Sequence, residues 1–216
     1  MLPGDPGRAM ALAQLLISKP LMSNHNRGLW GYTGETPEGR PLTVQSTGMG
    51  GPSAAIVLHE LAELGVERAI RVGTCGAVDE SLQLGDLVRA EAALPEDGVS
   101  RELGAEGPQP ADPGLLASLE RAGGSKPVTA VTTDFFYEYT GDPRERWIEA
   151  GAGVVEMEAC ALFTLGPRLG VAVGCLLVVT DVFPGGERLR IDPELLESSV
   201  ERMGRAAAAA LADVNP

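Results

Sequence analysis

An arginine and a group of small residues form a pattern that could bind an anion. Arg71 follows an apolar-leaning run and is followed by Gly73, Thr74 and Gly76. Glycines let the backbone approach a ligand closely, and the stretch offers N–H, hydroxyl and guanidinium donors to it. We therefore expect a strand that ends at Val72 and meets an anion, although a surface arginine beside an ordinary turn would explain the same letters.

A second arginine follows a glycine turn near the N-terminus. The letters GDPGR at residues 4–8 precede residues 9–17, whose apolar positions recur at helical spacing. Because Pro6 suits a first helical turn, the glycine turn is expected at a helix N-terminus, where unpaired N–H groups and the helix dipole favour an anion. An ordinary helix cap would account for this stretch without a ligand.

Three carboxylates follow apolar segments that resemble strands. Glu156 and Glu158 bracket Met157 after an apolar pair, and Asp181 follows the apolar run 171–179, which is typical of a central strand. At the carboxyl ends of strands these side chains would face a crevice and accept hydrogen bonds from a polyol. Glu156 and Glu158 could equally mark an acid-rich helix start, which the helix dipole favours.

An aromatic cluster follows the strand predicted over 128–132. Asp134 precedes Phe135, Phe136 and Tyr137 in a chain of which aromatic residues make up only 4%. The cluster could stack on a planar ligand, or it could be an edge of the hydrophobic core. Together the arginines, carboxylates and aromatic residues fit an anion, a sugar and a flat base.

The elements that must position these residues indicate the α/β class. The strand 42–46, the glycine-rich junction 47–53, the helix 54–64 and the strand 68–72 predict a βαβ unit, whose parallel strands would end on one edge of a sheet. We expect a single domain over residues 1–216, with a mixed central β-sheet flanked by helices. Further expected elements are a hairpin turning at 37–39, a strand over 85–93, a polar excursion without assigned function over 95–113, and helices over 115–122, 159–169 and 193–214.

Composition argues against several classes of partner. The chain has 216 residues and a formal net charge of -13 without a basic block, so nucleic acid and anionic membranes are poor partners and any anion must be bound locally. Three cysteines stand far apart without metal spacing, which predicts a reduced protein with no metal site. No run approaches the ~20 apolar residues of a membrane span, and no apolar signal segment begins the chain, so we expect the cytoplasm.

The chemistry that this combination fits is cleavage of a glycosidic bond. Such cleavage passes through a ribosyl cation, so a phosphate held by arginines would serve both as nucleophile and as counter-charge. An acid near the base would protonate the leaving nitrogen.

The chain resembles the hexameric nucleoside phosphorylase family, which includes bacterial purine nucleoside phosphorylase and uridine phosphorylase. The motifs GDPGR, RGxxGYTG, STGMGGPS, RVGTCGA, VVEMEA and TDV occur in the family's order and with near-family spacing, so the resemblance covers nearly the whole chain. It implies a pentosyltransferase acting on a nucleoside and phosphate, with no cofactor beyond inorganic phosphate as co-substrate. It also implies a homo-oligomer, with a hexamer expected.

The resemblance further implies a role for each candidate site residue. Phosphate would be bound by Gly4, Arg8, Arg71 and Thr74, with Arg27 lent by the neighbouring subunit. Ribose would contact Met49, Met157 and Glu158, with Glu158 accepting its hydroxyls. The base would be surrounded by Cys75, Gly76, Phe136, Val155 and Glu156. Asp181 would donate a proton to the purine nitrogen N7, and Arg188 and Arg190 compete for the part of its assisting cation.

The N-terminal stretch departs from the family's pattern. Family members carry a dozen or more residues before GDPGR, comprising a strand and a histidine that reaches the neighbour's ribose, whereas here GDPGR follows Met1-Leu2-Pro3 directly. Either the natural chain begins further upstream, or the sheet loses its first strand and recognition of the ribose 5′-hydroxyl changes; we expect a truncated first strand. His25 and His59 lie in the wrong places to replace the family histidine, so no histidine is carried over.

The identity of the base depends on the aromatic segment. Uridine enzymes read their base through a Gln-x-Arg insertion, whereas here Phe136-Tyr137-Glu138 runs directly into Tyr139-Thr140-Gly141. With Asp181 this favours a purine nucleoside, although Thr74 and STGMGGPS lean towards the uridine enzymes. The alternatives are a uridine phosphorylase, a hydrolytic nucleosidase of the same fold, and a non-catalytic nucleoside-binding protein.

Overall fold

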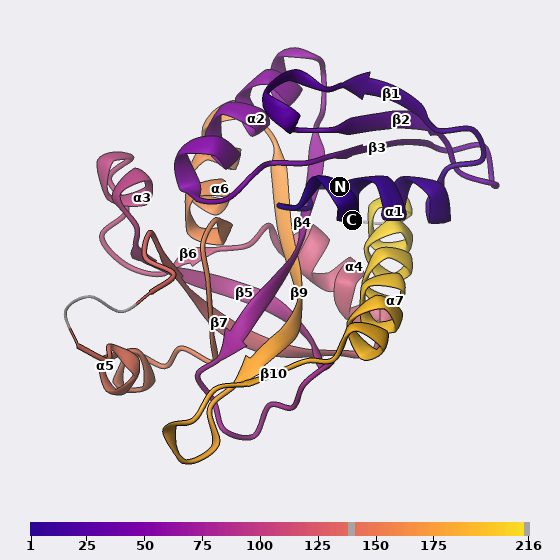
Figure 1. Ribbon diagram of the computed structural model, residues 1–216. Helices are drawn as coiled ribbons and strands as arrows, with labels where there is room; N and C mark the ends of the chain where they lie inside the picture. Colours follow the sequence, from indigo (N-terminus) through magenta and orange to yellow (C-terminus); the bar gives the residue numbers. More distant parts are fainter. Residues whose placement is uncertain (138–140, 214–216) are drawn as a thin grey trace.

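A seven-stranded mixed sheet lies at the centre of the computed structural model, which describes residues 1–137 and 141–213 (Figure 1). In order across the sheet, the strands are β10 (Leu189–Arg190), β9 (Ala172–Val182), β4 (Arg68–Ala77), β8 (Val154–Glu156), β7 (Ser125–Thr133), β5 (Leu87–Glu96) and β6 (Gln109–Pro110). This mixed central sheet, flanked by helices, confirms the predicted fold class.

The strands of this sheet run in two opposed directions. β4 and β9 are parallel, with Arg71 opposite Cys175. β5, β7 and β8 are parallel to one another and antiparallel to β4 and β9. A further pairing, of Leu87 in β5 with Val178 in β9, joins the two groups, so β9, β4, β8, β7 and β5 form a closed ring.

A separate three-stranded sheet consists of β1 (Leu21–Asn24), β2 (Gly31–Glu35) and β3 (Pro41–Gln45). β2 and β3 form the predicted hairpin, with Thr33 opposite Thr43. The predicted βαβ unit is wrong, because β3 belongs to this small sheet whereas β4 belongs to the central one. The helix between them, α2 (Gly51–Glu63), therefore connects two sheets (Figure 1).

Three helices begin with an aspartate followed by a proline. In each, the aspartate carboxylate accepts a hydrogen bond from the backbone N–H three residues on, and the proline takes a position whose N–H would have no helical partner. These helices are α1 (Pro6–Leu16), α4 (Pro113–Ala122) and α7 (Pro193–Ala212). Further helices are α3 (Gly98–Glu102), α5 (Arg144–Glu149), α6 (Ala159–Leu165) and the 3-10 turns Asn26–Gly28, Gly166–Leu169 and Pro184–Gly186.

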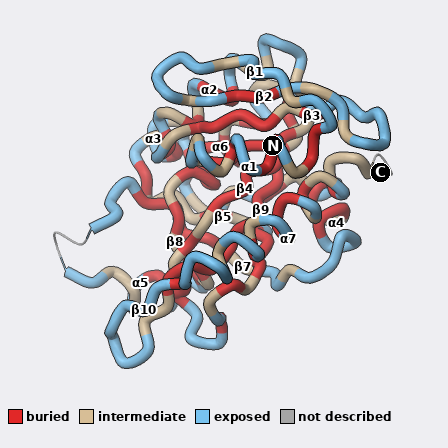
Figure 2. The backbone as a smooth tube through the Cα atoms, turned by 45° about the vertical axis from the view of Figure 1, so that its right-hand side comes forward, coloured by how far each residue is buried: buried red, intermediate tan, exposed pale blue. Residues whose placement is uncertain are grey.

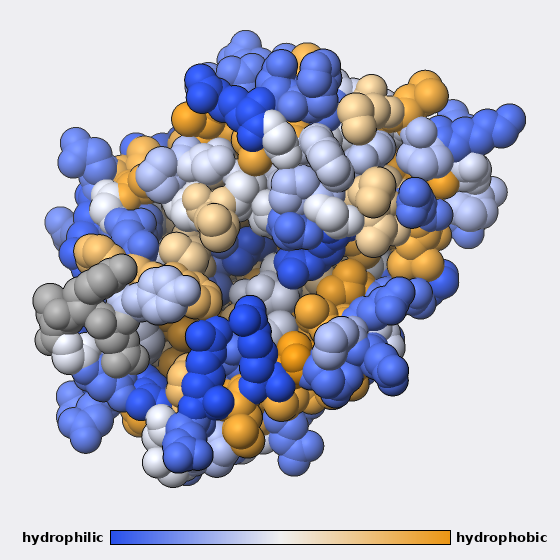
Figure 3. Space-filling model, viewed as in Figure 1, coloured by the Kyte–Doolittle hydropathy of each residue, from blue (hydrophilic) through white to orange (hydrophobic). Residues whose placement is uncertain are grey.

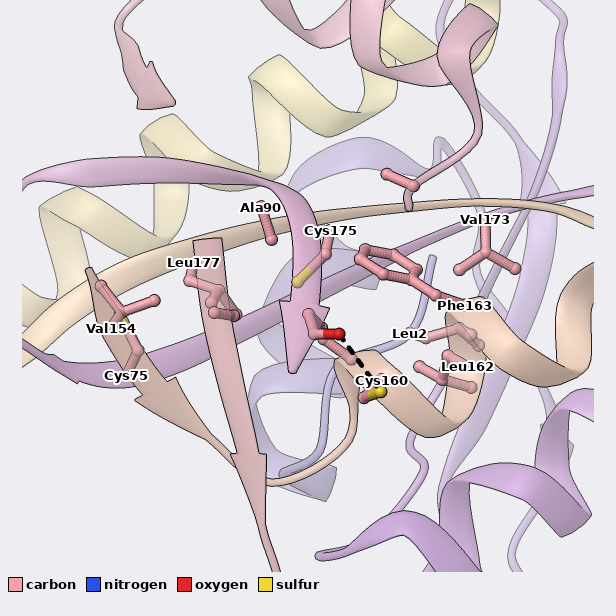
Figure 4. Close-up of a cluster of buried hydrophobic side chains, with 14 of the residues drawn as sticks. Leu2, Cys75, Ala90, Val154, Cys160, Leu162, Phe163, Val173, Cys175 and Leu177 are labelled. Atoms are coloured by element: carbon pink, nitrogen blue, oxygen red, sulfur yellow. Dashed lines mark hydrogen bonds between the residues drawn. The ribbon is translucent and has the colours of Figure 1, made fainter. Parts of the chain in front are cut away.

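Helices cover both faces of β4 and β9. On one face, Leu12 of α1 and Met203 of α7 join a buried cluster with Leu176. On the other face, Phe163 of α6 joins a cluster with Leu177 (Figure 4). Successive β9 side chains thus alternate between the two clusters, as strand geometry requires. Figure 2 shows the resulting concentration of buried backbone in the central strands.

The first residues of the chain run beside β4. The Leu2 N–H donates to the Ile70 carbonyl at 2.8 Å and the Val72 N–H donates to the Leu2 carbonyl at 3.1 Å, which makes a parallel bridge between Leu2 and Arg71. The single bridge between Leu2 and Arg71 thus takes the place of the first strand that the resemblance implies.

The described residues contain no helix long and apolar enough to cross a bilayer. The predicted terminal helix is confirmed to Ala212, and its predicted last residue, Val214, lies outside the described residues.

Candidate functional site

Arg71 lies in the middle of β4, which continues to Ala77, so the prediction that the strand ends at Val72 is wrong. The residue is 4% exposed. Its Nε donates to Glu156 Oε2 at 2.7 Å, and a terminal nitrogen lies 2.5 Å from Glu158 Oε2. Although burial alone would lower the pKa of the Arg71 guanidinium, Glu158 and Glu156 raise it, so the guanidinium stays charged.

The strand remains extended beyond Arg71 because small residues make room for the guanidinium. A Cβ at Gly73 would lie 2.8 Å from the Arg71 Cζ. Gly73 therefore lies within the strand and not in a turn. Its missing side chain leaves room for the Arg71 guanidinium to lie against the backbone.

Glu156 accepts several hydrogen bonds besides that of Arg71. The Thr132 hydroxyl, near the carboxyl end of β7, donates to its Oε1. The backbone N–H groups of Glu158 and Ala159 each donate to its Oε2 at 2.9 Å. Because these donors come from β7 and from the start of α6, Glu156 fixes the orientation of Arg71 relative to both elements.

Arg71 and the carboxylate pair meet because β8 runs against β4. Val155 lies opposite Gly76, so the chain leaves β8 towards the middle of β4. Asp181, by contrast, lies near the end of β9, also opposite Gly76. Val155 and Asp181 thus flank Gly76 from the two sides of β4, although β8 and β9 run in opposite directions. The direction of β8, which is only 3 residues long, is set by pairing with other strands, which local sequence does not encode.

Glu158 joins Arg71 to the glycine-rich junction before α2. Its Oε1 accepts a hydrogen bond from the Gly50 N–H at 2.6 Å, while its Oε2 faces Arg71. Gly50 has a φ of 88°, a left-handed conformation that glycine adopts without strain. Burial raises the pKa of Glu158, whereas Arg71 opposes this shift. The buried carboxylate thus presents itself as an acceptor between an arginine and a backbone N–H.

Arg8 and Gly4 lie close to this cluster. Burial lowers the pKa of the half-buried Arg8 guanidinium, and the charges of Asp5, Arg71 and Glu158 also act on it. The Gly4 carbonyl accepts a hydrogen bond from the Gly48 N–H at 3.0 Å, so the two glycine-rich junctions meet. The predicted helix N-terminus at GDPGR is confirmed by α1.

Thr74 and Arg27 occupy different environments. Thr74 is half-buried on β4, one residue past Gly73. Arg27 is exposed in a turn of the N-terminal sheet and has a φ of 55°, the one positive value among the non-glycine residues described. Within one chain, Glu156 and Glu158 contact Arg71, whereas Arg27 lies in a separate part of the fold, in the turn of the N-terminal sheet.

A hollow of about 490 Å³ lies beside the junction loop and the aromatic segment. Met49 is 84% exposed and Phe136 is 55% exposed. Figure 3 shows this face of the molecule hollowed between its upper and lower halves. The lining residues, which include three that the resemblance assigns to ribose and base, are Met49, Asp134, Phe135, Phe136, Tyr137 and Met157.

Asp181 is buried and held by two donors. The Thr180 hydroxyl donates to its Oδ2 at 2.8 Å, and Arg188 Nε donates to its Oδ1 at 2.7 Å. Arg190 Nε is farther away, at 3.8 Å from the same oxygen. Arg188 also lies over the Phe136 ring, with its Cζ 5.2 Å from the ring centroid. One arginine thus links the candidate proton donor to the aromatic segment.

Gly76 and Val155 lie between the carboxylate pair and Asp181. A Cβ at Gly76 would meet Val155 at 3.2 Å and the Phe183 ring at 3.6 Å. The Cys75 side chain instead points into the core, where its Sγ lies 3.6 Å from the Val178 carbonyl oxygen (Figure 4). At this position only the backbone could face a ligand.

A protein-family model described as the phosphorylase superfamily matches residues 1–214. The chain belongs to this superfamily. The DeoD-type purine nucleoside phosphorylase of Clostridium novyi (strain NT) is 36% identical over 195 residues, which cover 87% of this chain and 83% of the relative. The DeoD-type purine nucleoside phosphorylase of Alkaliphilus metalliredigens (strain QYMF) is 36% identical over 196 residues, which cover 87% of this chain and 84% of the relative. The guanosine phosphorylase of Halorubrum lacusprofundi is 32% identical over 216 residues, which cover 94% of this chain and 88% of the relative.

Within this superfamily member, sequence reasoning missed several residues of the site. Thr132 and the Gly50 N–H hold the two glutamates, and the Phe183 ring lies beside Gly76. Gly50 could have been found, because it lies in the singled-out stretch STGMGGPS. Thr132 had no local signal, since its role depends on the pairing of β7 with β8.

Two earlier expectations concern metals and the uridine-type insertion. The described residues include no group of three or more His, Cys, Asp or Glu side chains arranged to hold a metal ion. Residues 138–140, on which the comparison with uridine enzymes partly depends, lie outside the described part of the chain.

Proposed function

We propose that this protein cleaves the N-glycosidic bond of purine nucleosides with inorganic phosphate, releasing the free base and (deoxy)ribose 1-phosphate. The observation that carries the proposal is the Asp181–Arg188 pair, at 2.7 Å, in a member of the phosphorylase superfamily. At the base end, a guanidinium beside this carboxyl group stabilises the carboxylate that remains once a proton has passed to a leaving purine. Relatives named purine nucleoside phosphorylase and guanosine phosphorylase support the same reaction.

In the proposed reaction, a phosphate oxygen forms a bond to C1′ as the bond from C1′ to the base nitrogen breaks. The electron pair of that bond goes to the base, and Asp181 in its protonated form delivers a proton to the purine nitrogen N7. The ribosyl cation character that develops between the two groups is balanced by the phosphate. Arg188, at 2.7 Å, then stabilises the carboxylate that Asp181 becomes.

We assign phosphate binding to Gly4, Arg8, Arg71 and Thr74, and ribose binding to Glu158, Met49 and Met157. Glu158 is suited to accept the ribose hydroxyls, because its carboxylate is buried yet close to the hollow that Met49 and Met157 line. Cys75 through its backbone, Gly76, Phe136, Val155 and Glu156 would surround the base. The reaction needs no cofactor beyond phosphate.

The charges of the cluster support a contribution from a second subunit. Arg71 faces two carboxylates, so its positive charge is more than neutralised before an anion binds. Arg8 alone restores balance, and a phosphate therefore requires a further cation. We assign this part to Arg27 of a neighbouring copy in a homo-oligomer, a hexamer being the expected assembly.

The Arg27 assignment predicts both an assembly and a selective kinetic defect. Arg27→Ala should raise the KM for phosphate at least about tenfold, because a charge-assisted hydrogen bond is lost, and leave the KM for inosine within about twofold. Arg205→Ala, at an exposed arginine of α7, serves as the control. Sedimentation velocity measures the assembly, and a fully active monomer would contradict the assignment.

The reaction itself is tested by incubating the protein with inosine, adenosine or uridine, with and without phosphate. Ribose 1-phosphate formed from the purine nucleosides only when phosphate is present is the expected result. Cleavage without phosphate would identify a hydrolytic nucleosidase, preference for uridine a uridine phosphorylase, and binding without turnover a nucleoside-binding protein.

A further inference from the structure

Asp97 is a buried carboxylate outside the site described above. It lies between β5 and α3, is 0% exposed, and accepts a hydrogen bond from the Ser100 N–H at 2.8 Å through its Oδ2. Its Oδ1 has no hydrogen-bond partner among the described residues. A buried carboxylate is costly unless neighbouring donors or dipoles offset the loss of water, so its surroundings indicate what it does.

The start of α2 lies against this carboxylate. A Cβ at Gly51, the first residue of α2, would be 3.1 Å from Asp97 Oδ2 and 3.3 Å from the Ala161 Cβ of α6. α2 has a glycine cap without a side-chain hydrogen bond and no acidic residue in its first turn. Asp97 therefore supplies, from another element, the negative charge that a helix N-terminus favours.

The residue before Gly51 donates to the site. The Gly50 N–H bonds Glu158 Oε1 at 2.6 Å, so a shift of the α2 start would move a donor that orients Glu158. The same region also reaches the aromatic segment, because Asp134 Oδ2 accepts the N–H of Gly98, the first residue of α3, at 2.8 Å. Two lining residues of the hollow, Met49 beside Gly50 and Asp134, are thus connected to the turn at Asp97.

We propose that Asp97 is a positioning residue for the nucleoside: its buried carboxylate holds the start of α2, and through the Gly50 N–H it orients Glu158 toward the ribose. This inference rests on the proposed function. It separates two parts of the site, because Arg71, the phosphate ligand that also pairs with Glu158, is held independently through its Nε, which donates to Glu156 Oε2 at 2.7 Å. The nucleoside and the phosphate should therefore respond differently to a change at Asp97.

The test is Asp97→Asn, which keeps the shape and an acceptor for the Ser100 N–H but removes the charge at the α2 start. We expect the KM for inosine to rise about tenfold, as for the loss of one well-placed hydrogen bond, and the KM for phosphate to stay within about twofold. The preference for inosine over 2′-deoxyinosine should also shift, because Glu158 is less well oriented. Ser100→Ala is the matched control: it removes an equally buried hydroxyl, keeps the N–H, and should leave both KM values unchanged.

Gly51→Ala tests the same contact from the other side and should reproduce the selective rise in the KM for inosine. Equal rises in both KM values, or a lower Tm with unchanged kinetics, would overturn the inference. Calorimetric binding of inosine without phosphate gives a readout independent of turnover, with the Kd expected to rise about tenfold in Asp97→Asn. An inactive wild-type protein would count against the proposed function, whereas an unchanged inosine Kd in Asp97→Asn would count against the role of Asp97.

Discussion

Arg188 and Arg190 compete for one carboxylate, and their geometry separates them. Arg188 donates to Asp181 at 2.7 Å and lies over Phe136, whereas Arg190 is 3.8 Å away with 70% of its side chain exposed. We therefore predict that Arg188→Ala lowers kcat/KM for inosine about 100-fold, the scale of an assisted proton transfer. Arg190→Ala is the matched control and should lower it less than about threefold. Steady-state kinetics on both variants decides, and a larger effect of Arg190→Ala would reverse the assignment.

Arg71 should affect folding as well as catalysis. Its removal leaves Glu156 and Glu158 buried without their cation, so Arg71→Ala is expected to lower the free energy of unfolding by about 3–5 kcal/mol. Urea denaturation measures the change. Arg205→Ala, at an exposed arginine of α7, is the control and should change stability by less than about 0.5 kcal/mol. A stable Arg71→Ala protein would show that water reaches the two carboxylates.

The sequence predicted the charged residues of the site better than it predicted the residues that hydrogen-bond to them. Glu156, Glu158 and Asp181 were identified because they follow apolar segments that resemble strands, where a carboxylate would face a crevice. Asp97 did not stand out, since it lies in a segment rich in glycine, proline and acids that predicted a polar excursion. Its complete burial is a consequence of packing between α2, α3 and α6, which no local pattern reports.

Among the elements, α7 is fixed at its end by an arginine of β4. Arg68 donates to the carbonyls of Leu211 at 3.0 Å and Ala210 at 3.3 Å, which have no partner within the helix. We predict that Arg68→Ala lowers the free energy of unfolding by about 1–2 kcal/mol without changing the KM values. Thermal denaturation checks this, with Arg205→Ala, an exposed arginine of the same helix, as the control. Equal stability of the two variants would contradict the prediction.

Helix positions were predictable and strand directions were not. The Asp-Pro pairs before α1, α4 and α7 are local chemistry, so the sequence located these helices. The partner of each strand is a long-range property, which is why β3 was assigned to the wrong sheet. Leu189 and Arg190 form β10 only by pairing with β9, and no local pattern predicted that strand.

The reactivity of the three cysteines measures how often the core of the molecule opens to solvent. Cys75, Cys160 and Cys175 are buried, and burial raises the pKa of each thiol, that of Cys160 to about 11. Because the thiolate is the reactive form, we predict that the native protein at pH 8 reacts with a disulfide reagent only at its unfolding rate. In denaturant all three thiols should react at once. Fast labelling of the native protein would contradict this burial.

The pairing of β5 with β9 has a mechanical consequence. It closes the ring of strands, so β9 is paired on both sides at residues 176–178, with β4 and with β5, while β4 at Arg71 lies between Cys175 of β9 and the bridge to Leu2. The segment that carries Arg188 has no such brace, because β10 pairs with β9 over two residues and follows the glycines 185 and 186, both at positive φ. The end of the site at Arg71, which would bind the phosphate, is therefore rigid. The end at Arg188, which would bind the leaving base, is more flexible. Such a division allows bases of different size to be accommodated without disturbing the geometry of attack.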